Sequence, residues 1–180
     1  MIKIMNVKYL ATLFLTSLLT VGLGDSLSAS TPTPASDTSQ TVAQSVATTR
    51  HPAVYTENGI ALDGQDVVAY FVQNALVEGK QEFSYTWNGV RWLFSNAAHR
   101  DLFAQNPEQY APQYGGYCAK AAAGGVLATT VPTAWEVRDG KLYLNYSAQA
   151  QNEWRQDTAT KIVKANANWP KILNNDVIKR

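Results

Sequence analysis

Three side chains in this 180-residue chain have the types and spacing for metal binding or nucleophilic chemistry. His99 lies four residues after Ser95 in the stretch FSNAAHRDLF, so on a helix both side chains share one face. Imidazole is the commonest metal ligand among side chains and titrates near neutral pH. Cys118, the only cysteine of the chain, is a second soft donor. If the fold brings them together, His99 and Cys118 form a candidate metal site.

Each of these residues also has a simpler interpretation. His99 can be a partly buried histidine that hydrogen-bonds to a neighbour. Cys118 follows Gly115-Gly116-Tyr117 and precedes alanines, which is typical of a small apolar core residue. The alternative is a thiolate activated by a helix start or by His99, able to hold Cu(I) or react with oxidants. The two glycines either permit close packing or leave backbone N–H groups free to bind an anion.

Other polar and aromatic residues are assigned structural roles. Asp66 is placed to cap a short helical turn, and His51, beside Pro52, is expected to be solvated. The five Trp and nine Tyr could line a cleft on which a sugar or another ligand stacks. Their alternation on two predicted hairpins favours a role in the core.

The elements that must position these residues are two hairpins and several short helices. In FSYTWNGVRWLF, Phe83, Tyr85 and Trp87 alternate with polar residues before Asn88-Gly89, the kind of pair that a type I′ turn requires. In WEVRDGKLYLNY, Trp135 and Val137 precede a second turn at Asp139-Gly140. Ser95 or Asn96 should cap a helix to about Gln105, and Pro107 should open another. After Ser147, helical patterns run to Trp169-Pro170. These elements predict an α+β fold with a small antiparallel sheet, built from the two hairpins and packed by short helices and a C-terminal helical segment.

The N-terminal third predicts export. Residues 1–29 have early lysines, an apolar run and a small-residue exit, as in a secretory signal peptide, and the run is short for a membrane anchor. Residues 30–50 are rich in Thr, Ser, Ala and Pro and are expected to form a disordered tether. We expect one folded domain over 51–173, a frayed tail over 174–180, and a periplasmic or extracellular location without stable membrane insertion after cleavage.

Charge and cysteine content exclude some functions. Fifteen Lys and Arg against fourteen Asp and Glu give a formal charge of +1 without a basic stripe, so nucleic acid is not an expected partner. A single cysteine allows no internal disulfide.

The motifs GIALDGQDVVAYF, WNGVRWLFSNAAHRDLFAQNPEQYAPQYGGYCAKA and WEVRDGKLYLNY, with NANWP beyond them, resemble a secreted YHS-domain protein. The resemblance covers roughly Gly59 to Pro170. YHS domains are similar to small cysteine-rich metal-binding modules whose helix begins with a Phe-Cys-Ser-x-x-x-Cys-like stretch. In this chain Ser95 stands at the first cysteine and His99 at the second, so one soft ligand is a hydroxyl and the other an imidazole.

The resemblance implies a non-catalytic extracytoplasmic binding module. We expect a transition metal as its ligand, copper ahead of zinc, held by His99 and Cys118. A four-ligand zinc site would also need His51 and a carboxylate such as Asp66 or Asp101, and no spacing supports that set. One alternative is a structural or protein-interaction domain that has lost its metal site, as Ser95 suggests. A second is a thiol-dependent redox or hydrolytic enzyme with Cys118 as nucleophile and His99 as base.

Overall fold

The computed structural model of the chain describes residues 50–180. The predicted signal peptide and all but the last residue of the predicted tether lie outside the described residues. Residues 50–180 form one body of helices and small mixed sheets, which confirms the predicted α+β class. None of the helices between residues 50 and 180 has the length and hydrophobicity needed to span a bilayer.

The first part of this body is a four-stranded sheet in the order β1-β2-β4-β3. Its elements are β1 (Thr56–Glu57), β2 (Ile60–Ala61), the 3-10 helix η1 (Leu62–Gly64), α1 (Val67–Val72), β3 (Lys80–Trp87) and β4 (Val90–Phe94). The β3–β4 hairpin turns at Asn88 and Gly89, whose φ angles of 50° and 73° are those of the predicted type I′ turn.

Two helices follow the hairpin where the sequence predicted them. They are α2 (Ala97–Gln105) and α3 (Pro107–Tyr110). The Asn96 side chain accepts a hydrogen bond from the backbone N–H of His99 and so caps α2. Pro107 begins α3, where its missing N–H leaves no hydrogen bond unmade.

The second part contains the other hairpin and the C-terminal helices. Its elements are η2 (Gln113–Gly116), α4 (Ala119–Ala123), β5 (Leu127–Ala128), β6 (Val131–Arg138), β7 (Lys141–Asn145), α5 (Ala148–Arg155), α6 (Thr158–Asn168), η3 (Lys171–Asn174) and β8 (Ile178–Lys179). Ser147 and Asp157 cap α5 and α6 through their side chains. Helix α4 packs against α6 and α5.

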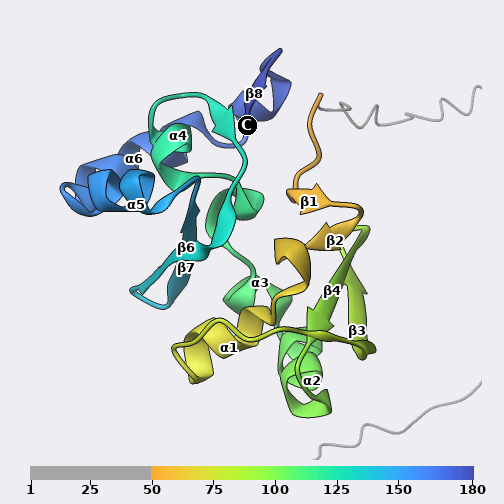
Figure 1. The fold of residues 1–180 in the computed structure, drawn as a ribbon. Coiled ribbons are helices and arrows are strands. Elements are labelled where there is room, and N and C mark those ends of the chain that lie inside the picture. The colour runs from red at the N-terminus through yellow and green to blue at the C-terminus, as the bar shows by residue number, and fades with distance from the viewer. Residues whose placement is uncertain (1–49) are drawn as a thin grey trace, which may run out of the picture. The chain divides into compact units, whose positions relative to one another are not determined.

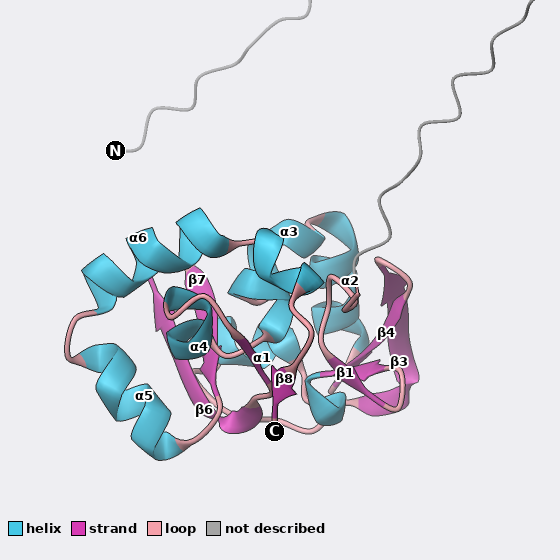
Figure 2. Ribbon diagram, turned by 90° about the horizontal axis from the view of Figure 1, so that it is seen from above, coloured by secondary structure: helices cyan, strands magenta, loops and turns pink. Residues whose placement is uncertain are grey.

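The two parts have separate hydrophobic clusters. The β3–β4 hairpin lies with α2, whereas the β6–β7 hairpin lies with α4 to α6, in both views (Figure 1 and Figure 2). Helices α1 and α3 contact α2. The first cluster centres on Trp92, Phe94 and Phe103, together with Leu142 and Leu144 of β7. The second centres on Tyr143 and Trp154. Strand β7 therefore joins the clusters, because alternate side chains point to its opposite faces.

Three expectations are corrected. The two hairpins do not share a sheet, because the free edge of β4 pairs with β2, and β6 and β7 form their own two-stranded sheet. The tail does not fray as predicted, because β8 pairs with β5 in parallel and Ile178 packs against the second cluster. His51 is half-buried, with its Nε2 3.0 Å from the Asn175 carbonyl oxygen, so it is not a solvated residue.

Candidate functional site

The residues singled out on α2 meet a carboxylate from another element. Strand β4 ends at Phe94, and the cap at Asn96 fixes the first turn of α2, which carries His99. Asp66 caps α1, as the sequence predicted, and its Oδ1 accepts hydrogen bonds from the backbone N–H groups of Val68 at 3.0 Å and Ala69 at 3.3 Å. Its other oxygen is left to face α2.

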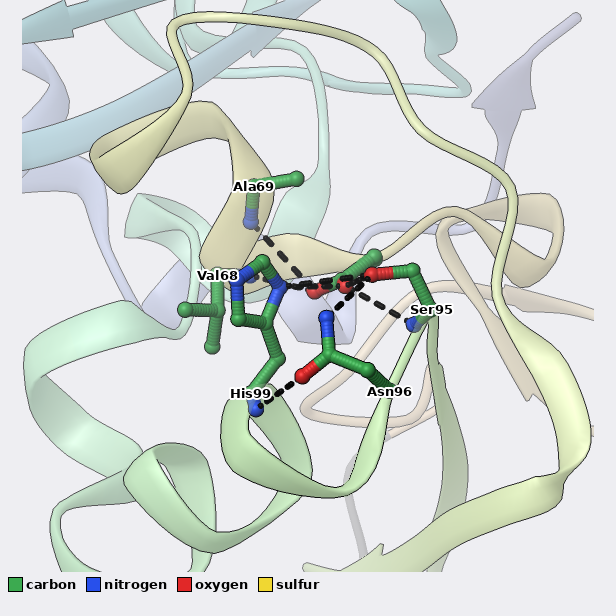
Figure 3. A network of polar contacts seen from close by, with 6 residues as sticks. Val68, Ala69, Ser95, Asn96 and His99 are labelled. Atoms are coloured by element: carbon green, nitrogen blue, oxygen red, sulfur yellow. Dashed lines mark hydrogen bonds and ion pairs between the residues drawn. The ribbon is translucent and has the colours of Figure 1, made fainter.

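The second oxygen of Asp66 joins α1 to the end of β4 and the start of α2. Oδ2 accepts hydrogen bonds from the Ser95 hydroxyl at 2.6 Å, from the Ser95 backbone N–H at 2.8 Å and from His99 Nδ1 at 2.6 Å. Figure 3 shows Ser95, Asn96 and His99 converging at this point. Asp66 is fully buried and His99 is 8% exposed. Five donors therefore satisfy one buried carboxylate, the condition under which a buried charge is tolerated.

This arrangement fixes the tautomer of His99. A 2.6 Å contact with a carboxylate requires the proton to be on Nδ1, so the neutral ring has its lone pair on Nε2. The three residue types are those of a Ser-His-Asp triad, but the connections differ. In a triad the imidazole stands between the other two, whereas here the Ser95 hydroxyl bonds to the carboxylate itself and lies 3.4 Å from the same ring nitrogen. Ser95 is not activated as a nucleophile.

Cys118 lies in a different environment, immediately before α4. Its Sγ accepts a hydrogen bond from the Tyr146 backbone N–H at 3.3 Å and lies 3.8 Å from the Asn145 side-chain oxygen. The thiol is 2% exposed, and burial raises its pKa. Backbone N–H groups of Ala121, Tyr146 and Lys120 and the Lys120 charge act in the opposite direction without overcoming burial. Cys118 is a protonated thiol at neutral pH.

A pocket of about 500 Å³ opens beside this thiol. Its cationic lining residues are Lys120, Lys179 and Arg180, and the others are Cys118, Tyr146, Gly124 and the small apolar residues Ala121, Val126, Ala128 and Ala150. No acidic side chain lines it, although the Lys120 ammonium forms an ion pair with Glu153 just outside. The pocket combines an apolar wall with a positive rim.

The structure does not bring His99 and Cys118 together. Helix α2 contributes Phe103 to the first hydrophobic cluster, whereas the residues next to Cys118 belong to the second. Figures 1 and 2 both show α2 and α4 in different parts of the fold. No contact between the two side chains is found, because each has its partners within its own part.

The wider ligand set for zinc is dispersed as well. Asp101 pairs with Arg100 at the surface, and His51 lies against Asn175. Within residues 50–180, no three side chains of His, Cys, Asp or Glu cluster in a way that could hold a metal ion. The donor set of this chain does not fit the tetrahedral site of the cysteine-rich modules.

Sequence reasoning missed two parts of these sites. It identified Asp66 as a cap, but Asp66 and His99 are 33 positions apart in the sequence and no local signal shows that they pair. It assigned Lys179 and Arg180 to a frayed tail, although they line the Cys118 pocket. The local signal for a strand there is the β-branched pair Val177-Ile178, which is too short to predict one.

Comparisons of the chain with protein-family models, with curated proteins and with solved structures found no match.

Proposed function

We propose that this chain is an exported, non-catalytic binding module of the YHS type, and that its ligand site is the pocket beside Cys118. One observation carries the proposal: an apolar pocket of about 500 Å³ has three cationic and no acidic side chains in its lining. Such a site fits a small anion with an apolar portion, for example a carboxylate with a short hydrocarbon chain. Lys179 and Arg180 would meet the charge.

Binding is favoured over catalysis by the state of the thiol. Burial raises the pKa of Cys118, so little thiolate is present at neutral pH. The imidazole expected to act as its base is held by Asp66 in the other part of the fold. A hydrolytic role for Cys118 therefore lacks a partner that could take its proton.

The network at Asp66 supports a module without the metal site of its proposed relatives. Ser95 and His99 stand at the two cysteine positions of the resemblance, and both donate to Asp66. A hydrogen-bonded cross-link takes the place of a metal in joining α1 to α2. Titration of residues 30–180 with Zn²⁺ and with Cu(I) should therefore give no tight 1:1 binding that depends on both His99 and Cys118. Tight binding lost in both His99→Ala and Cys118→Ala would contradict this view.

The ligand class is tested with octanoate by isothermal titration calorimetry. Octanoate should bind, octan-1-ol should bind more weakly, and added salt should weaken octanoate selectively. The double variant Lys179→Gln, Arg180→Gln should bind octanoate about tenfold more weakly, since exposed charge pairs contribute up to about 1 kcal/mol each. The matched control is Lys141→Gln, which changes a cation outside this pocket. Equal affinity for octanoate and octan-1-ol, or no binding of either, would overturn the proposal.

A second candidate function is thiol redox chemistry at Cys118. The backbone N–H groups at Sγ would stabilise a thiolate once it forms, and the pocket gives a small oxidant access. In this reaction the Cys118 thiol loses its proton, the thiolate sulfur attacks one oxygen of hydrogen peroxide and the O–O bond breaks. The sulfur becomes a sulfenic acid, and the departing hydroxide takes up the proton that the thiol lost and leaves as water. Rapid gain of one oxygen atom in the intact mass at neutral pH, absent in Cys118→Ala, would favour this candidate. Inertness of the thiol would favour the binding module.

A further inference from the structure

A second pocket, of about 340 Å³, shares no residue with the Cys118 pocket. Four aromatic residues line it: Trp87, Trp92, Tyr114 and Trp169. Trp92 belongs to the first hydrophobic cluster and Tyr114 to the second, with Trp169 packed against it. The pocket thus lies where the two clusters meet, a common location for small-molecule sites.

Hydrogen bonds position Tyr114, one of the aromatic residues of this pocket, and its backbone is in an unusual conformation. Tyr114 has a φ of 55°, a left-handed conformation that is unfavourable for a side chain of this size. The next residue, Gly115, has a φ of 60°, and its carbonyl accepts a hydrogen bond from Tyr55 N–H at 2.8 Å. The Tyr114 hydroxyl donates to Asn166 Oδ1 at 3.0 Å. The ring of Tyr114 is therefore fixed from both ends.

The charge of the pocket is opposite to that of the Cys118 pocket. Its lining contains no Lys, Arg or His, and Glu108 is the only charged side chain in it. Glu108 is exposed and, within residues 50–180, forms no ion pair or hydrogen bond through its carboxylate. The lining thus combines a carboxylate without an ion-pair partner among residues 50–180 with four aromatic residues. The half-buried Trp87 and Trp169 offer most of the accessible ring surface, because Trp92 and Tyr114 are 1% and 5% exposed.

We propose that this pocket binds a small organic cation of the quaternary-ammonium class. Aromatic faces carry the negative end of a quadrupole and attract cations, and such ligands are bound elsewhere by groups of aromatic rings. Glu108 adds a carboxylate, and no protein cation in the lining competes for it. The volume of about 340 Å³ suits a molecule of few heavy atoms.

The same features make a carbohydrate a poorer ligand. A sugar stacks on one flat ring and satisfies its hydroxyls with several side-chain donors and acceptors. Here the charged donors Arg, Lys and His are absent from the lining, and the Asn166 carbonyl oxygen is already used by Tyr114. The amide groups of Asn88 and Gln113 and the NH₂ group of Asn166 remain, which is few for a ligand with many hydroxyls.

The test compares choline with 3,3-dimethylbutan-1-ol, which has the same shape without the charge. Both are titrated into residues 30–180 by calorimetry, with tryptophan fluorescence as a second readout, and glucose is the third probe. Choline should bind about tenfold more tightly than its neutral analogue, because the aromatic faces and Glu108 attract only the charged ligand. Equal affinity for the two, preference for glucose, or no binding of choline would overturn the proposal.

Substitutions of residues that line the pocket test whether choline binds there. Glu108→Gln should weaken choline severalfold and leave the neutral analogue unchanged, whereas Glu82→Gln, on an exposed part of β3, should change neither. Trp169→Leu should weaken choline more than Trp169→Phe, which keeps an aromatic face. Urea unfolding of each variant separates loss of binding from loss of fold. Full choline affinity in both Glu108→Gln and Trp169→Leu would place the binding elsewhere and reject this site.

Discussion

At the scale of single residues, Asp66 connects more of the fold than any local pattern around it suggests. One of its oxygens caps α1, and the other accepts three hydrogen bonds from Ser95 and His99. The donors come from segments about thirty residues apart in the chain. Because the carboxylate is fully buried, these donors would be left without an acceptor if it were removed.

We expect Asp66→Asn to destabilise the protein strongly. The amide keeps one oxygen but presents an NH₂ group to donors that need an acceptor, so we expect a loss of about 3 kcal/mol in the free energy of unfolding. The matched control, Asp101→Asn, removes an exposed carboxylate that pairs with Arg100 and should cost less than about 1 kcal/mol. Urea unfolding of both variants measures this, and similar losses would contradict a cross-linking role for Asp66.

The raised pKa of Cys118 predicts a pH dependence of stability. The thiol of the unfolded chain ionises at about pH 8.5, whereas burial keeps the folded thiol protonated to higher pH. The unfolded state therefore releases its proton first, so this stabilising contribution is complete below about pH 8.5 and is lost as pH rises toward the folded pKa. Tyr70, Tyr114 and Tyr117 also have pKa values raised by burial, but they act only above about pH 10.

Urea unfolding at several pH values between 7.0 and about 9.5 isolates the cysteine, since tyrosines contribute little there. The wild type should lose stability across this range, and Cys118→Ala should lose less. Cys118→Ala should be less stable at pH 7.0 because the Tyr146 N–H loses its acceptor, so the slope and not the absolute value is the readout. Equal slopes would mean that the thiol is not held protonated by the fold.

At the scale of elements, local rules predicted turns and helix starts well. Asn88-Gly89 and Asp139-Gly140 form the expected hairpins, Asn96 caps α2 as expected, and α5 begins directly after Ser147. These features depend on residues within about four positions of one another. Pairings that depend on distant segments could not be predicted. The parallel contact of β2 with β4 and of β5 with β8, and the contact of Asp66 with His99, leave no mark on the residues between them.

The difference between local and long-range features also explains why the predicted metal donors His99 and Cys118 do not meet. Helical spacing predicted that Ser95 and His99 share one face of a helix. In the structure Ser95 precedes the Asn96 cap of α2, yet its hydroxyl still lies 3.4 Å from His99 Nδ1. Nothing in the sequence fixed the relation between α2 and Cys118, because it depends on which hairpin each one packs against. The two hairpins carry similar patterns but form different sheets.

Gly115 gives a prediction at the level of the 3-10 helix η2. Its φ is 60°, and a Cβ placed there would lie 1.9 Å from the Ala53 carbonyl oxygen, so alanine would be both strained and obstructed by backbone. Gly89 has a φ of 73° but nothing within 4 Å of its Cβ position. Gly89→Ala should therefore cost about 1–2 kcal/mol, the strain of a left-handed residue, and Gly115→Ala should cost clearly more.

Thermal and urea unfolding measure the stability of both variants. Gly89→Ala reports backbone strain alone, and Gly115→Ala reports strain together with the steric clash against the Ala53 carbonyl oxygen. Gly115→Ala should also weaken choline binding in any fraction that remains folded, because Gly115 lines the aromatic pocket. Gly89→Ala should leave choline binding unchanged. If the two variants were equally stable, the close approach of residues 53 and 115 would not be a feature of the protein in solution.

At the scale of the whole described body, the C-terminal strand connects stability to the proposed anion site. Strand β8 closes the second part by pairing with β5, and Lys179 and Arg180 then reach the pocket beside Cys118. Ile178 packs against the second cluster, whereas its neighbour Val177 is 69% exposed. The two residues differ in burial but have similar size and the same hydrophobic character.

This contrast gives a matched pair of substitutions, Ile178→Asp and Val177→Asp. Ile178→Asp should lower the free energy of unfolding by about 2 kcal/mol, because it removes an apolar side chain from the cluster and brings a charge against it. Val177→Asp should change stability by less than about 0.5 kcal/mol, as surface substitutions do. Both variants add the same negative charge near Lys179 and Arg180, so any purely electrostatic effect on octanoate affinity should be common to them. A larger loss of octanoate binding in Ile178→Asp, measured where both variants remain folded, would then show that docking of β8 forms the pocket. Equal stability and equal binding in the two variants would mean that the tail is frayed, as the sequence alone suggested.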